Sequence, residues 1–178
     1  MNTKMEAGIN TPAVTLVVLV ENKPGVLARV ADLFARRGFN IESLAVAPTS
    51  NDSLSRITIV VGGDQTPIDQ ITSQLFKLIN VVEIAQVKPA DAIQRELLIA
   101  TLSVGPNDRS QVVELVNLFD GKVVGVGPTH VTVSMEAGPL TVDNFEALLG
   151  DYKIVDMQRS GLVALPKVGT EVRRLRAV

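Results

Sequence analysis

The chain has 178 residues, of which 46% are hydrophobic and 20% are charged, with a formal net charge of −2. This composition is typical of a folded chain that forms one domain or two small ones. The absence of cysteine excludes disulfides, thiolate nucleophiles and Cys-ligated metals, and the single histidine excludes a multi-His metal site within one chain. Few aromatics and a weak negative charge argue against a nucleic-acid surface.

The longest mainly apolar run, residues 14–20, is far shorter than the roughly 20 residues that a bilayer requires. Residues 1–12 lack the apolar region of a secretory leader and predict a flexible extension. We therefore expect a cytoplasmic protein that binds neither membrane nor nucleic acid. Three arginines near the end, Arg173, Arg174 and Arg176, favour a basic tail that is simply solvated, over residues 169–178.

The first half of the chain shows a clear order of elements. Strands are expected at residues 14–20, 41–47, 55–61 and 81–87. Two amphipathic helices separate them. The apolar stripe of the first helix is Val26, Leu27, Val30, Leu33 and Phe34. The second helix starts near Pro67, and its apolar stripe is Ile68, Ile71, Leu75, Leu78 and Ile79. The order β-α-β-β-α-β is the ferredoxin-like arrangement.

The second half repeats this order, with strands at residues 96–104, 122–126, 131–135 and 153–158. Helices are expected around residues 112–119 and 142–149. The fold class is therefore α+β, with two tandem ferredoxin-like domains at residues 13–89 and 95–168. In the first strand both faces are apolar, so the open face of the first sheet needs a cover. We favour a homodimer here; the alternative is that the second domain folds back over it.

A candidate binding site lies at the turn that follows the first strand, residues 21–27. Its sequence, Glu-Asn-Lys-Pro-Gly-Val-Leu, places Gly25 where a helix begins, so free N–H groups and the helix dipole would attract a carboxylate. Asn22 and Asn40 could hydrogen-bond a ligand there. In the alternative interpretation Asn22 caps the helix and Asn40 adopts a left-handed turn conformation. No residue pattern indicates a catalytic site or a metal site.

Two long stretches carry a resemblance to a known family. Residues 19–30, LVENKPGVLARV, and residues 33–44, LFARRGFNIESL, strongly resemble the small, regulatory subunit of acetolactate synthase, also called acetohydroxyacid synthase. The match continues through LSRITIVV at residues 54–61, RELL at 95–98 and RSGLVAL at 159–165. The resemblance implies that the first domain is an ACT domain, a ferredoxin-like module that senses amino acids.

The resemblance also implies a function. Small subunits of this family lack catalysis, bind and activate the thiamine-diphosphate-dependent catalytic subunit, and confer feedback inhibition by valine in branched-chain amino acid biosynthesis. It implies that this chain has no cofactor, whereas thiamine diphosphate, Mg and FAD belong to the catalytic partner. The valine site lies between two paired ACT domains, and motif correspondence assigns it to Asn22, Gly25, Val26, Leu27, Asn40 and Ile41.

We expect the ligand carboxylate at the N–H groups of residues 25–27, Asn22 and Asn40 at its polar end, and Val26 and Ile41 around the isopropyl group. Two alternatives remain open. The chain could be an ACT-type sensor that serves a different biosynthetic enzyme, which co-purification with a large thiamine-dependent subunit would test. It could also be an independent enzyme, which turnover of pyruvate by the isolated chain would reveal.

Overall fold

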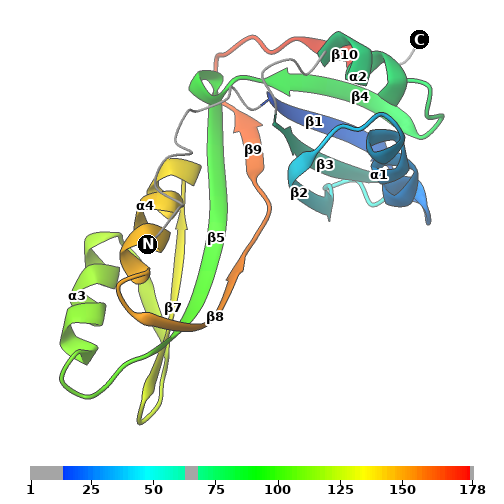
Figure 1. The fold of residues 1–178 in the computed structure, drawn as a ribbon. Coiled ribbons are helices and arrows are strands. Elements are labelled where there is room, and N and C mark those ends of the chain that lie inside the picture. Colours follow the sequence, from blue (N-terminus) through cyan, green and yellow to red (C-terminus); the bar gives the residue numbers. More distant parts are fainter. Residues whose placement is uncertain (1–13, 63–67, 177–178) are drawn as a thin grey trace. The chain divides into compact units, whose positions relative to one another are not determined.

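The computed structural model describes residues 14–62 and 68–176, and Figure 1 shows the order of the elements. The chain divides into two compact units. The first contains the chain up to Ala92 together with the segment from Ala164 onward, and the second is Ile93–Val163. Each unit is an antiparallel sheet with two helices on one face, which confirms the expected pair of ferredoxin-like βαββαβ folds.

The first unit has a five-stranded sheet in the order β10-β4-β1-β3-β2. Its elements are β1 (Val14–Glu21), α1 (Val26–Arg36), β2 (Ile41–Pro48), β3 (Leu54–Val61), α2 (Ile68–Leu75), β4 (Val81–Val87), the 3-10 turn η1 (Pro89–Asp91) and β10 (Arg174–Arg176). Alternate residues of β1, Leu16, Val18 and Val20, are buried against the helices, where they meet Phe34 of α1 and Leu75 of α2. This apolar layer fixes α1 on the sheet.

The second helix is shorter than the sequence predicts. It ends at Leu75, and the chain then tightens into turns, with the N–H groups of Lys77 and Leu78 donating to the carbonyls of Gln74 and Leu75. Leu78 still packs on the core, whereas Ile79 is 89% exposed, so its assignment to the buried stripe is wrong. The expected start at Pro67 lies outside the described residues.

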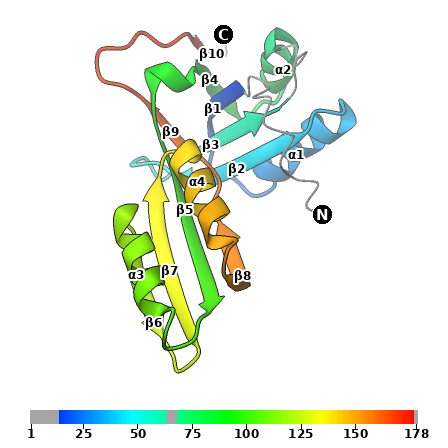
Figure 2. The ribbon, with the colours of Figure 1, turned by 60° about the vertical axis from the view of Figure 1, so that its left-hand side comes forward.

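The second unit has β6-β7-β5-β8 as neighbouring strands. Its elements are β5 (Ala92–Ser103), α3 (Arg109–Leu118), β6 (Lys122–Val126), β7 (His130–Ala137), α4 (Pro139–Leu149), β8 (Lys153–Arg159) and β9 (Val163–Pro166), which spans the boundary between the units. Figure 2 shows α3 and α4 along one face of β5 and β7. Phe145 of α4 is fully buried there and packs against Phe119, with ring centroids 5.2 Å apart.

An ion-pair cluster ties α4 to the strands of the second unit. The Arg159 guanidinium donates through Nε to Glu96 at 2.8 Å, and also to Asp143 at 2.6 Å and to Glu146 at 3.3 Å. Glu96 is only 8% exposed, so its carboxylate depends on this partner. Arg159 and Ser160 begin the RSGLVAL stretch, and the Ser160 hydroxyl accepts a hydrogen bond from the N–H of Leu97, so part of this motif has a structural role.

The end of the chain differs from the expected solvated tail. Arg174–Arg176 forms strand β10, which pairs antiparallel with β4 at the edge of the first sheet. Arg174 also lies 3.5 Å from the Glu83 carboxylate. Sequence reasoning missed this strand because three residues carry no periodicity. Within the described residues, no helix is both long and apolar enough to cross a membrane.

Candidate functional site

The turn between β1 and α1 depends on the backbone conformation of Gly25. This residue is the N-cap of α1 and has φ 83° and ψ −7°, in the left-handed region that favours glycine. An added Cβ would meet nothing within 4 Å, so the conformation, and not crowding, explains the glycine. The carbonyl of Gly25 accepts from the N–H of Arg29 at 3.1 Å, which is the first bond of the helix.

The start of α1 presents unpaired main-chain donors. Within residues 14–62 and 68–176, the N–H groups of Gly25, Leu27 and Ala28 have no hydrogen-bond partner, and that of Val26 makes only a 3.3 Å bond to the Lys23 carbonyl. The first turn carries no acidic residue, and no side chain caps it. Free donors at the positive end of the helix dipole form an arrangement that binds a carboxylate.

Asn22 lies beside these donors but does not cap the helix. Its Nδ2 donates to the carbonyl of Asp52 at 3.0 Å, and its main-chain N–H donates to the carbonyl of Ser53 at 2.8 Å. The β2–β3 turn therefore holds the Asn22 side chain in place. Its Oδ1 has no partner in the described part of the chain, so it can accept a hydrogen bond from a ligand ammonium.

Charged side chains that the sequence analysis missed surround this turn. The Glu21 carboxylate accepts from Asn80 Nδ2 at 2.5 Å and from Lys23 Nζ at 3.0 Å, and these two hydrogen bonds, that of Asn80 first, lower the pKa of Glu21. Arg29 donates to Asn80 Oδ1 at 3.1 Å. Lys23 thus balances the charge of Glu21, and Arg29 adds a positive charge in the first turn of the helix.

The six expected site residues fall into two groups. Asn22, Gly25, Val26 and Leu27 lie at the end of the sheet where β1 finishes, because Glu21 pairs with Leu54. Asn40 and Ile41 lie at the opposite end, because Ile41 pairs with Val61, as does Val14 at the start of β1. Seven residue steps of about 3.3 Å separate the two ends. Within one chain the two groups therefore do not form a single site.

The apolar members of the two groups differ in exposure. The Val26 side chain is buried in the core, so the exposed apolar side chain next to the free N–H groups is that of Leu27, at 41% exposure. Ile41 is partly buried at the edge strand. Asn40 is exposed and does not adopt the left-handed conformation of the alternative interpretation, since among the described non-glycine residues only Asp120 has positive φ.

The structure thus shows two ferredoxin-like units, with an uncapped helix start in the first and no cluster of metal-binding side chains among the described residues. Residues 16–83 match the "AHAS small subunit-like ACT domain", and residues 95–168 match the "small subunit of acetolactate synthase". Taken together, the two matches cover both halves of the chain, and the resemblance drawn from the sequence motifs is confirmed.

Individual relatives agree with these matches. The chain is 44% identical over 157 residues to the acetolactate synthase small subunit of Mycolicibacterium smegmatis, covering 88% of this chain and 92% of that protein. It is 43% identical to the probable acetolactate synthase small subunit of Archaeoglobus fulgidus, covering 85% and 94%. A crystal structure of the Thermotoga maritima small subunit superposes with a TM-score of 0.82 at 33% identity, covering 89% and 99%. The chain belongs to the family of acetolactate synthase small subunits.

Proposed function

We propose that this chain is a non-catalytic subunit that activates the catalytic subunit of acetolactate synthase and makes it sensitive to valine. The observation that carries the proposal is the start of α1, where unpaired N–H groups lie beside the fixed side chain of Asn22 in a member of the small-subunit family. Thiamine diphosphate, Mg and FAD belong to the catalytic partner in this proposal. The chain itself contributes binding and regulation.

A pair of chains would bring the two groups of residues together. β2 lies at an edge of the first sheet, where β3 is its one neighbour in the described sheet. If two β2 strands pair antiparallel about a two-fold axis, the beginning of each strand meets the end of the other. Asn40 and Ile41 of one subunit then reach the end of the combined sheet where α1 of the partner subunit begins. The pairing therefore supports two equivalent sites per dimer.

An α-amino acid fits the chemistry of such a site. Its carboxylate would accept from the N–H groups of Leu27 and Ala28, and its ammonium would donate to Oδ1 of Asn22 and of the opposing Asn40. The isopropyl group of valine would contact Leu27 and Ile41. Because one methylene is worth about 1–3 kcal/mol in an apolar pocket, leucine and isoleucine belong in the same titration as competitors.

The test substitutes Gly25 and measures valine binding by calorimetry, together with valine inhibition of the reconstituted enzyme. Gly25→Asp places a carboxylate beside the one that the ligand brings, and at a separation of about 4 Å this repulsion weakens binding at least 100-fold. Gly25→Asn has a similar size and tolerates positive φ, so it separates the charge from the shape. Gly169→Asp, at φ 81° with nothing within 4 Å, is the control for backbone strain.

We expect valine sensitivity to disappear in Gly25→Asp and to persist in Gly169→Asp, with activation of the catalytic subunit retained in both. Full valine sensitivity in Gly25→Asp would show that the site is wrongly placed. Failure of the unmodified chain to bind and activate an acetolactate synthase catalytic subunit would overturn the proposed function itself.

A further inference from the structure

The C-terminal segment completes the first sheet after the chain has passed through the second unit. The register of β10 on β4 pairs Arg174 with Ala85, Leu175 with Ile84 and Arg176 with Glu83. The middle of the β4 edge, residues 83–85, is therefore occupied, whereas β2 at the other end of the described sheet has a single neighbour. The two sides of the sheet thus differ, because β4 is partly covered by β10 whereas the outer side of β2 has no strand beside it in the described sheet.

Several contacts hold the C-terminal segment in place. Val172 packs with Ala85, Val87 and Ala92 on the sheet face opposite the helices, where Val17 of β1 joins them. Lys167 anchors the approach to the strand, because its Nζ donates to the carbonyl of Ala90 at 2.8 Å and its N–H donates to the carbonyl of Asp91 at 2.9 Å. The segment is therefore fixed on both sides of the turn at Gly169.

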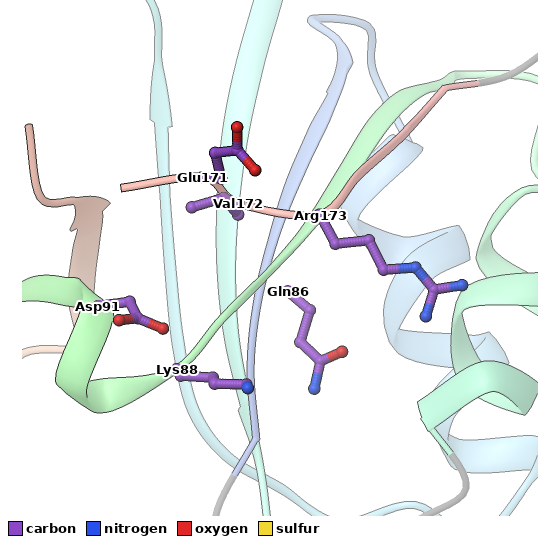
Figure 3. A pocket seen from close by; sticks show the side chains of 6 residues that line it. All are labelled: Gln86, Lys88, Asp91, Glu171, Val172 and Arg173. Carbon is purple, nitrogen blue, oxygen red and sulfur yellow. The ribbon is translucent and has the colours of Figure 1, made fainter. Parts of the chain in front are cut away.

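The side-chain ion pairs of the C-terminal segment contribute little to its attachment. The ion pairs Arg174–Glu83, at 3.5 Å, and Arg173–Asp69, at 3.9 Å, involve exposed arginines, and such pairs contribute about 0–1 kcal/mol each. Before the strand begins, the segment and the end of β4 flank a pocket of about 330 Å³. Figure 3 shows its charged lining, with Lys88 and Asp91 on one side and Glu171 and Arg173 on the other.

We propose that β10 is an edge guard, which occupies β4 so that copies of this chain pair through β2 alone. An exposed strand edge is a template for pairing with another chain. With the three-residue, arginine-bearing β10 at one edge, only β2 offers a long template, and copies then form a closed two-fold dimer. A sheet with two long open edges would instead join copies into open-ended assemblies. The occupant of the β4 edge is the chain's own C-terminal strand, and its removal admits a second copy. The inference rests on the proposed pairing through β2.

The test compares the mass of the full chain with that of a chain ending at Thr170, by light scattering across a concentration series. We expect a dimer for the full chain, and for the shortened chain a mean mass at least about twice as large that rises with concentration. A synthetic peptide of residues 171–178 added in excess should bind the bare edge and return the mass to that of the dimer.

A point substitution keeps the test valid if the shortened chain does not fold. Leu175→Pro places in the middle of β10 a residue that lacks the N–H group and is poorly tolerated in strands, so it should also raise the mass. Val168→Pro is the matched control, because Val168 is fully exposed in the turn before Gly169, where proline is favoured. This control should remain a dimer.

The outcomes separate the two proposals. A full chain and variants that all remain dimers would refute the edge guard and leave pairing through β2 intact. A monomeric full chain whose shortened form dimerises would refute pairing through β2 and, with it, the edge guard, because the inference rests on that pairing. Monomers throughout would refute both.

Discussion

Complementation between two damaged chains tests whether each valine site is built from both subunits. Gly25→Asp damages the helix start, and Asn40→Ala damages the residue that the opposing subunit would contribute. Each homodimer then has two defective sites, so calorimetric titration with valine should detect no heat of binding. In a heterodimer one site takes Gly25 from one chain and Asn40 from the other, so it is intact, while the second site carries both lesions.

The expected magnitude follows from this geometry. When equal amounts of the two variants are unfolded together in urea and refolded, half of the dimers are mixed, and about a quarter of all sites are intact. Calorimetry should therefore recover valine binding with about a quarter of the parent stoichiometry and with the parent affinity. The result distinguishes a shared site from any site within one chain, for which mixing restores nothing.

A matched control uses two lesions from the same half of the site. Mixing Gly25→Asp with Asn22→Ala leaves every site with one lesion, so no binding should return. Native mass spectrometry of differently tagged chains verifies that mixed dimers have formed. Mixed dimers without recovered binding in the Gly25→Asp and Asn40→Ala experiment would refute the shared site.

Three further predictions concern stability. Because its pKa is lowered from the ordinary 4.5, Glu21 stabilises the fold at neutral pH and loses this effect as pH falls through the folded pKa, so the difference in urea midpoint between the parent and Glu21→Gln should shrink between about pH 5 and pH 3. Arg159→Met should lower the free energy of unfolding by about 2 kcal/mol in urea titrations by leaving Glu96 unpaired, less than for a fully buried pair because Arg159 keeps some exposure, and adding Glu96→Gln should recover part of the loss. Phe145→Ala should cost about 3–5 kcal/mol in calorimetric unfolding while valine binding persists, since Phe145 lies in the core of the second unit.

Much of the fold could be predicted because it is encoded by local periodicity. The alternation in β3 and the helical stripe from Val26 to Phe34 each identify an element without knowledge of its neighbours. The end of α2 could not be predicted in this way. Apolar residues continue at helical spacing past Leu75, and the chain leaves the helix although Leu78 still reaches the core.

The candidate site was predicted as a motif, but its internal contacts were not. The glycine at a helix start is a local signal, which is why Gly25 could be identified from the sequence. The hydrogen bond from Asn22 to Asp52 joins residues 30 positions apart, and the one from Asn80 to Glu21 joins residues 59 positions apart. A local sequence pattern cannot predict contacts over such separations. The separation of Asn40 from Asn22 likewise follows from strand register, which a sequence pattern alone does not give.

The position of β10 has a consequence for how the protein folds during its synthesis. During synthesis Val14–Val87, which holds the residues of the first core, is made well before Arg174–Arg176, so its sheet lacks β10 until those residues have been added. The nascent first unit is therefore left with β4 uncovered for the time needed to translate about ninety more residues, at roughly 5–20 residues per second. Chains that are being synthesised on the same mRNA could pair through the exposed β4 edge during that interval. The interval ends when Arg174–Arg176 have been made and β10 can form.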